Sequence, residues 1–254
     1  KYPFTISRSG VAINYTPWLR QLTNDIALLN AAGYYRIGDY QAVSGSLRYF
    51  SLGEVITETG DMTIKPYEMA VDIAYSRMLS ETFSAAVALR YIYSDLSGHY
   101  DDNVKPGSAF AADISAYNQS YVLIGQRECQ LGLGLNISNI GSKISYGDDY
   151  SYFIPTNLRL GASLMVPIDE YNRISFSADV NKLLVPSMPL KLEGEEEADY
   201  QDRLKTDYYD VSSISGIFKS FGDSERGFKG ELEEIQWSVG AEYNYNDKFF
   251  LRAG

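Results

Sequence analysis

The residues with the clearest chemical potential in this chain begin with its single histidine, His99. A histidine that acts as a general base needs a nucleophile within reach and a third group that orients it. Asp101 and Asp102 follow His99 closely, but the segment around them completes no such set of groups. We therefore expect a solvated loop histidine, no catalytic residue and no enzymatic activity.

One cysteine and one acidic run are the other candidates. Cys129 has no second cysteine to pair with and no histidine near it in sequence, so we expect a small buried residue rather than a reactive thiol. The run Glu193–Asp199, with Asp202, Asp207 and Asp210, offers the oxygen ligands that divalent cations prefer. It lacks the Asp-x-Asp-x-Asp-Gly spacing of a calcium loop. The sequence therefore predicts a solvated acidic segment, with no metal site and no cofactor.

Two further charged residues belong to a predicted hairpin within Ile154–Pro186. On both sides of the turn Asp169–Asn172, apolar residues take the even positions and polar or small residues take most odd positions. Because side chains alternate faces along a strand, each arm has one apolar and one polar face. Arg159 and Asp179 lie on the polar face, ten residues either side of Asp169. A three-residue connection centred on Asp169 places them opposite each other, as an ion pair in the interior of a barrel.

The same alternation recurs along the chain and predicts eleven strands. They are expected at Gly10–Thr16, Asp25–Ile37, Val43–Tyr49, Lys65–Met78, Phe83–Tyr93, Ser108–Tyr117, Cys129–Ser138, Asn157–Val166, Arg173–Asn181, Ile235–Tyr243 and after the turn Asn244–Asp247. From the second strand onward the connections run alternately short and long, with one of intermediate length at Asn118–Arg127. Short turns at one end and long loops at the other are typical of outer-membrane barrels.

The placement of charge favours the same architecture. The polar rows contain Arg48, Asp72, Arg90, Asp113, Arg159, Asp179 and Glu242, whereas the apolar rows carry no charge within their cores. An arginine on a lipid-facing surface costs about 2–4 kcal/mol at the bilayer midplane, so we expect the apolar rows to face lipid. These rows include Leu158, Leu160, Leu164, Phe176, Trp237 and Val239. The sequence predicts an all-β, antiparallel, up-and-down transmembrane β-barrel that forms a single domain over residues 1–254.

Composition excludes other classes of protein. No run of about 18 apolar residues is present, so no helical membrane span is expected. The formal net charge of −11 argues against nucleic acid as a partner, because phosphates favour a basic surface. Bacterial single-chain barrels close with an even number of strands. Eleven strands therefore indicate that the barrel continues beyond residue 254.

Several blocks of residues, in order, resemble the PorV family of outer-membrane barrels. This family belongs to the type IX secretion system of Bacteroidetes and is related to the FadL-type transporters. The blocks are Tyr15–Leu19, Ser46–Glu54, Asn136–Gly141, Ile154–Arg159, Asn181–Pro186 and Ser215–Phe218. The resemblance implies a barrel of 14 strands, of which about 11 are present here, and a location in the bacterial outer membrane.

The resemblance also implies a non-enzymatic role in protein transport. Members of this family are expected to bind the C-terminal signal domain of secreted cargo and to carry it from a giant translocon barrel to a sortase-like attachment complex at the cell surface. Membrane lipids or lipopolysaccharide are further expected partners. Two alternatives remain open. A FadL-like transporter of hydrophobic small molecules needs an apolar pocket and a route through the barrel, and a lipid A deacylase needs a Ser or Asp–His site that the sequence does not offer.

The segment Ser187–Leu232 is predicted to be a long extracellular insertion that forms much of the partner-binding face. Loops of this length are generally functional or disordered. Its acidic first half is expected to be disordered, and its aromatic second half, Tyr208–Phe228, is expected to order over the barrel mouth or against a partner. The candidate partner-binding residues are the apolar side chains of the long connections: Trp18, Leu19, Phe153, Leu183, Leu184, Ile217, Phe218, Phe221 and Phe228.

Overall fold

A computed structural model describes residues 7–20, 25–56, 63–96, 105–147, 150–224 and 226–254, and β-strands make up most of it. His99, Asp101 and Asp102 lie outside the described residues. The strands are β1 (Ser9–Pro17), β2 (Ile26–Ile37), β3 (Gln41–Leu52), β4 (Val55–Ile56), β5 (Thr63–Ile64), β6 (Tyr67–Met78), β7 (Phe83–Asp95), β8 (Gly107–Ile124), β9 (Arg127–Gly141), β10 (Asn157–Pro167), β11 (Asn172–Leu183), β12 (Gln236–Tyr245) and β13 (Phe249–Ala253).

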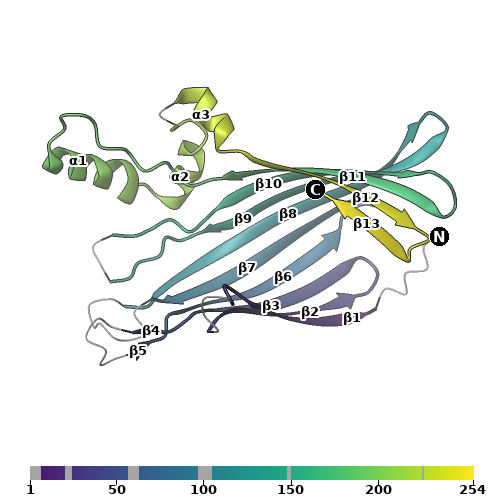
Figure 1. The fold of residues 1–254 in the computed structure, drawn as a ribbon, viewed down its shortest axis with the longest axis horizontal. Helices are drawn as coiled ribbons and strands as arrows, with labels where there is room; N and C mark the ends of the chain where they lie inside the picture. The colour runs from purple at the N-terminus through teal and green to yellow at the C-terminus, as the bar shows by residue number, and fades with distance from the viewer. Residues whose placement is uncertain (1–6, 21–24, 57–62, 97–104, 148–149, 225) are drawn as a thin grey trace.

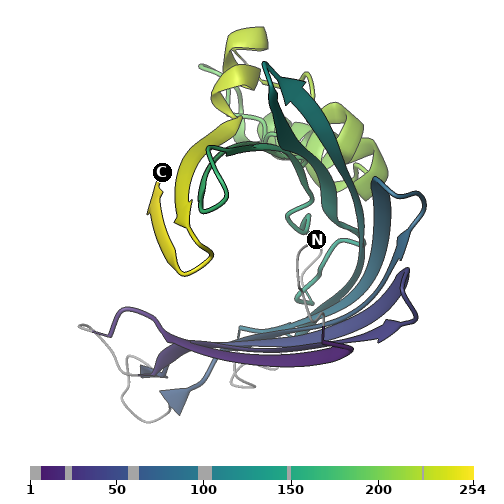
Figure 2. The same cartoon turned by 90° about the vertical axis from the view of Figure 1, so that its right-hand side faces the viewer.

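Eleven of these strands form one antiparallel sheet in the order β1-β2-β3-β6-β7-β8-β9-β10-β11-β12-β13 (Figure 1). Only β4 and β5 stand apart, as a two-stranded ribbon within the connection from β3 to β6. The sheet curls into an arc that stays open between β1 and β13 (Figure 2). The predicted all-β, up-and-down, barrel-like fold with eleven strands is therefore confirmed.

The two faces of this sheet differ as the alternation predicts. Leu160 stands opposite Leu135 and Val180, and Val180 stands opposite Trp237, so apolar side chains run across four neighbouring strands. Trp237 is 72 % exposed. The described residues of the β9–β10 connection, 142–147 and 150–156 (segment 142–156 hereafter), lie inside the arc and pack on the other face (Figure 2). The exposed apolar rows therefore cover the convex face. Of the side chains expected there, Leu160, Phe176, Trp237 and Val239 are exposed, and Leu158 and Leu164 are half-buried.

The connections separate by length between the two ends of the sheet. The short ones, at 38–40, 79–82, 125–126, 168–171 and 246–248, all lie at one end. The long ones, between β1 and β2, β3 and β6, β7 and β8, β9 and β10, and β11 and β12, all join strands at the other end. The predicted intermediate connection at Asn118–Arg127 is wrong, because β8 runs on to Ile124 and turns at Gly125, whose φ of 65° suits glycine.

The longest connection, between β11 and β12, folds into helices at the end of the sheet that carries the long loops (Figure 1). They are α1 (Glu197–Leu204), the π-helix η1 (Lys205–Tyr209), α2 (Ser213–Lys219) and α3 (Gly227–Glu233). No helix among the described residues is long and apolar enough to cross a membrane.

The predicted disorder of the acidic first half of this insertion is wrong, because its carboxylates have basic partners close by. Arg203 Nη2 lies 2.8 Å from Glu195 Oε2, and Lys191 Nζ lies 2.6 Å from Glu197 Oε2. The hydrogen bond from Arg203 lowers the pKa of Glu195 to about 2. Leu204 is buried at the end of α1. Net charge describes a segment as a whole and does not show such local pairing.

Candidate functional site

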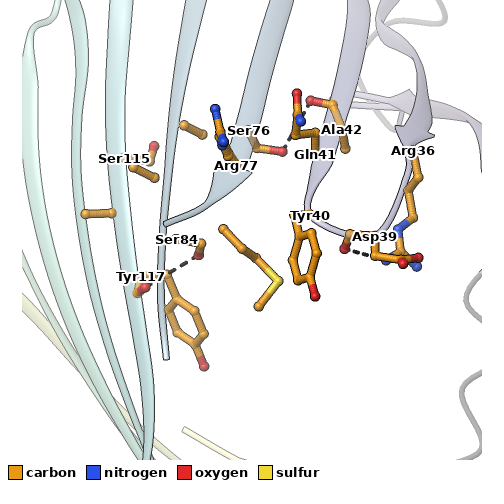
Figure 3. A pocket seen from close by; sticks show the side chains of 14 residues that line it. Arg36, Asp39, Tyr40, Gln41, Ala42, Ser76, Arg77, Ser84, Ser115 and Tyr117 are labelled. Carbon is orange, nitrogen blue, oxygen red and sulfur yellow. Dashed lines mark hydrogen bonds between the residues drawn. The ribbon is translucent and has the colours of Figure 1, made fainter. Parts of the chain in front are cut away.

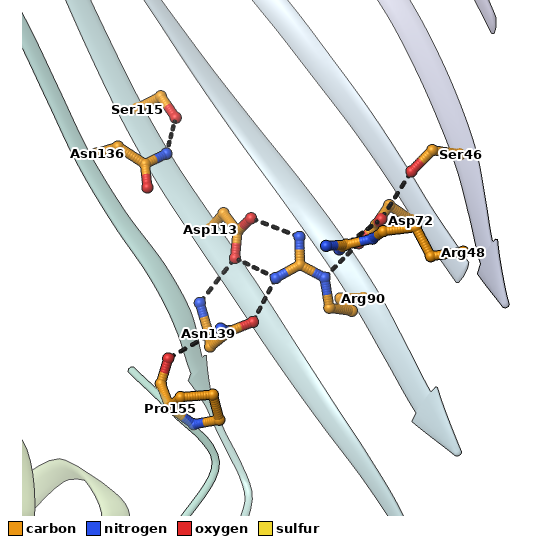
Figure 4. A network of polar contacts seen from close by, with 9 residues as sticks. All are labelled: Ser46, Arg48, Asp72, Arg90, Asp113, Ser115, Asn136, Asn139 and Pro155. Carbon is orange, nitrogen blue, oxygen red and sulfur yellow. Dashed lines mark hydrogen bonds and ion pairs between the residues drawn. The ribbon is translucent and has the colours of Figure 1, made fainter. Parts of the chain in front are cut away.

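A polar ladder crosses the concave face, and five neighbouring strands contribute side chains to it, with Ser46 and Arg48 both coming from β3 (Figure 4). Ser46 of β3 donates to Asp72 of β6 over 2.7 Å. Arg90 of β7 is hydrogen-bonded to Asp72 through Nε and to Asn139 of β9 through Nη1. Its two terminal nitrogens lie 3.2 and 2.9 Å from the carboxylate oxygens of Asp113 on β8, a two-point contact that fixes the guanidinium plane. The ladder therefore joins β3 to β9 through charged groups.

Asn139 reaches this ladder because the strand bulges there. The register of β8 and β9 shifts between Ala112 and Ile114, and Asn139 has a φ of 58°, which asparagine tolerates better than most residues. Its backbone N–H donates to Asp113 over 2.8 Å, and its side chain donates to the carbonyl of Pro155 over 2.9 Å. Asn139 thus connects the ladder to the segment above it. It lies in a block that carries the family resemblance, but its bulge has no signal in the sequence pattern.

The segment 142–156 covers part of the concave face beside the ladder. Ile144 and Ile154 form a buried cluster with Ala109 and Ala111 of β8. Beneath this cover lies a cavity of about 530 Å³. Its wall combines charged side chains with apolar ones and includes Arg48, Glu68, Arg90, Phe50, Ile92 and Tyr152. The volume would suit a small molecule.

A second hollow, of about 270 Å³, lies on the same face near the short turns (Figure 3). Arg36, Tyr40, Arg77 and Tyr117 are among the residues that line it. Its polar contacts join residues of one turn or of neighbouring strands, such as the bond from Arg36 to the backbone carbonyl of Asp39 over 3.2 Å and the bond from Ser84 to the backbone carbonyl of Tyr117 over 3.4 Å. The residues that line this hollow do not form the set of nucleophile, general base and orienting group that a catalytic site needs. No cluster of three or more metal-binding side chains occurs among the described residues.

The insertion is fastened to the segment 142–156. Lys143 donates to the carbonyls of Tyr208 and Tyr209 over 3.3 and 2.9 Å, and its ammonium stands 3.9 Å from the centre of the Phe153 ring. Burial lowers the pKa of Lys143, although Asp210 opposes the shift. Aromatic contacts between Phe153 and Tyr208 complete this junction. The described residues of the β9–β10 and β11–β12 connections therefore form one packed cap at this end of the sheet.

The predicted partner-binding residues divide into two groups. Phe153 packs inside the cap, Leu184 is 3 % exposed and Ile217 is half-buried, so these three have structural contacts. The side chains that are exposed by half or more are Trp18, Leu19, Leu183, Phe218, Phe221 and Phe228. Phe218 of α2 is 75 % exposed, and Ile214 on the same helix is 56 % exposed. Exposed apolar side chains of this kind mark surfaces where other molecules bind.

The predicted ion pair between Arg159 and Asp179 is wrong. Arg159 stands opposite Asn181, to which its Nε donates over 3.2 Å, and Asp179 stands opposite Gly161. The side chain of Asp169 accepts from the backbone N–H groups of Tyr171 and Asn172, so it begins the turn instead of occupying its centre. Moving the centre of a hairpin by one residue moves every cross-strand partner by two.

The sequence pattern also did not single out Lys182, which lies in the apolar row at the end of β11. Its side chain is 9 % exposed, and its Nζ lies 2.8 Å from Glu231 of α3 and 2.7 Å from Glu234. The hydrogen bond from Lys182 lowers the pKa of Glu231. The signal in the sequence that could have indicated this buried ion pair was a lysine in a row of apolar positions. Its partners come from a helix about fifty residues later in the chain and could not be foreseen.

Cys129 is buried with 0 % exposure, as predicted. Comparison with known proteins gives one family: a family model described as "Type IX secretion system protein PorV" matches residues 1–190 of the chain. No curated protein matches it. The matched region contains β1 to β11 and therefore includes the whole polar ladder and the segment 142–156.

Proposed function

Because the chain belongs to the PorV family of type IX secretion system proteins, we propose that it is a non-enzymatic cargo shuttle of the outer membrane. It would bind the C-terminal signal domain of secreted proteins at the translocon and carry them to the attachment complex on the cell surface. The observation that carries this proposal is the family match over the barrel strands, together with the apolar surface on the cap.

The exposed convex face supports a location in the outer membrane. Val71, Ile73 and Leu89, on two neighbouring strands, are 43, 64 and 64 % exposed, and Trp237 is 72 % exposed. Apolar side chains in contact with water contribute nothing to stability, whereas about 25 cal/mol is gained for each Å² transferred to a hydrocarbon environment. The charged ladder lies on the opposite face, away from lipid. In this orientation the long connections face the cell exterior.

The docking face for cargo is centred on α2. This helix places Ile214 and Phe218 one turn apart on its exposed side, while Gly216 is buried against Phe153. Lys143 holds η1, which precedes α2, and Gly216 of α2 packs against Phe153 and Pro186, so the surface is presented without first having to order itself. A preorganised surface loses less conformational entropy on binding.

The alternative function, transport of hydrophobic small molecules, is favoured by the cavity of about 530 Å³ under segment 142–156. Arg48, whose side chain is 43 % exposed, and the exposed Glu68 in its wall count against an apolar ligand, because each would lose water without gaining a polar partner from such a ligand. The cargo shuttle therefore remains the function that the site supports best.

Two variants of the full-length protein separate these functions. In Ile214→Ser/Phe218→Ser we expect the amount of cargo that co-purifies with the barrel to fall at least about tenfold, because truncation of a central interface side chain costs about 2 kcal/mol. The matched control is Met188→Ser/Leu192→Ser, which removes exposed apolar side chains from the same insertion outside α2. In this control cargo should be retained.

The second variant, Ala70→Phe, fills the cavity under segment 142–156, which Ala70 lines. A shuttle should retain cargo and secretion in this variant, whereas a transporter should lose uptake of its ligand. If the α2 variant assembles normally and keeps its cargo, α2 is not the docking face. If Ala70→Phe alone abolishes the cellular activity while cargo binding is unchanged, the transporter is favoured.

A further inference from the structure

Helix α3 packs on the outside of the barrel wall, although it belongs to the cap. Lys182 lies in the convex apolar row, opposite Leu158, and one position along the row Val180 stands opposite Leu160. Glu231 of α3 and Glu234, directly after it, reach Lys182, so the helix is held against this convex row of β10 and β11. In Figures 1 and 2, α3 stands outside the arc of the sheet.

A groove of about 270 Å³ runs between α3 and the wall, and its lining is largely apolar. Leu160 and Val180 form its wall side, and Phe221, Phe228 and Leu232 form its helix side. These side chains are from 42 to 79 % exposed, Phe228 the most. The groove is therefore apolar, open and continuous with the convex apolar rows.

Helix α3 also has the two-sided character of a helix at a membrane surface. Phe228 and Leu232 lie four residues apart and share one side, next to the groove. Arg226 and Glu233, which form an ion pair of 2.5 Å, and the exposed Lys229 carry the charge. Amphipathic helices of this kind rest at the boundary between headgroups and acyl chains.

From these contacts we infer that α3 is a lipid-binding anchor, whose groove accommodates an acyl chain of the outer leaflet. The inference rests on the proposed outer-membrane location. An acyl chain fits better than a protein side chain, because the wall side of the groove is the same apolar row that faces lipid further along the strands. The ammonium of Lys182 lies at the end of this row nearest the long connections, where Glu231 balances its charge and the second carboxylate, of the 39 % exposed Glu234, stays in contact with water. The anchor would hold the cap, and with it α2, at a defined height above the membrane.

Photo-crosslinking of the full-length protein in nanodiscs of radiolabelled dioleoyl phosphatidylcholine tests the inference. Benzoylphenylalanine is incorporated at Phe228, at Phe218 as the matched control on α2, or at Trp237 as the reference on the barrel wall. We expect lipid adducts at positions 228 and 237 and severalfold less at 218. Lys182→Glu should repel Glu231 and Glu234, detach α3 and reduce the adduct at 228 severalfold, while the adduct at 237 is unchanged.

The outcomes separate this inference from the proposed location. Lipid adducts at 237, with no more at 228 than at 218, would overturn the anchor and leave the membrane barrel standing. Adducts of 228 with a protein chain in place of lipid would overturn it in favour of a protein-binding groove. An adduct at 228 that persists in Lys182→Glu would overturn the role of the lysine. Absence of lipid adducts at 237 would overturn the membrane location, and the anchor with it.

Discussion

The polar ladder makes a quantitative prediction about the stability of the barrel. Arg90 lies between Asp72 and Asp113, and the three side chains are only 13, 10 and 15 % exposed. With Arg48, which contacts Asp72 over 3.2 Å, the group holds two positive and two negative charges. Arg90→Met removes one positive charge and leaves a carboxylate without compensation. Loss of one partner from a buried ion pair costs about 3–5 kcal/mol, so we expect the free energy of unfolding to fall by that amount.

Removal of the matching negative charge should reverse most of this loss. In Arg90→Met/Asp113→Asn the remaining pair, Arg48 and Asp72, is balanced, and the amide oxygen at position 113 can still accept the backbone N–H of Asn139. The double variant should therefore be more stable than Arg90→Met by about 2 kcal/mol or more. Asp113→Asn alone should cost only about 1–3 kcal/mol, because Arg90 keeps Asp72 and Asn139 as partners.

Urea titration of the full-length protein in lipid vesicles, followed by intrinsic fluorescence, measures these differences. Two results would refute the reasoning. One is a loss below about 1 kcal/mol in Arg90→Met, well under the cost of an unpaired buried charge. The other is a double variant no more stable than Arg90→Met, which would show that the packing of the arginine stem matters and its charge does not.

Two further predictions concern the cap. Gly216→Ala places a Cβ 2.7 Å from Cε1 of Phe153 and should weaken the hydrogen-exchange protection of α2. Gly222→Ala, with nothing within 4 Å of its Cβ, should leave this protection unchanged. Equal protection in the two variants would contradict this packing. Arg203→Gln should raise the pKa of Glu195 from about 2 toward its ordinary value of 4.5, measured by carboxyl NMR titration. Because folding lowers the pKa of Glu195, the stabilisation from its pair with Arg203 is present above about pH 4.5 and is lost as pH falls through about 2. If the pKa of Glu195 is the same in Arg203→Gln as in the parent protein, the arginine is not the cause of the lowered pKa.

Alternation along the strands was enough to predict most of the fold. The period of two is a local property of an extended chain, so the positions of the eleven strands, the apolar convex rows and the polar concave rows could be derived from residue order. The placement of Arg90, Asp72 and Asp113 on the polar face follows from the same rule. The burial of Cys129 was likewise predicted from its type and its sequence neighbours alone.

The partners across strands depended on features that a period of two does not contain. The ion pair expected between Arg159 and Asp179 failed because Asp169 begins its turn through its side chain, which shifts the register by two residues. The contact of Asn139 with Arg90 required a bulge and a positive φ, and both depend on the neighbouring strand and on the segment above it.

The position of the insertion was decided only by tertiary structure. Its length and its aromatic residues indicated an exposed functional segment, and its net charge wrongly suggested disorder in the first half. Lys182 and α3 lie together because a buried ammonium requires carboxylate partners. The carboxylates of Glu231 and Glu234 lie beside Lys182 only in the folded chain, in which the insertion returns over the wall. Residue order determines what each strand exposes on its two faces, whereas long-range contacts such as this one, which no sequence period encodes, decide which surfaces the long connections cover.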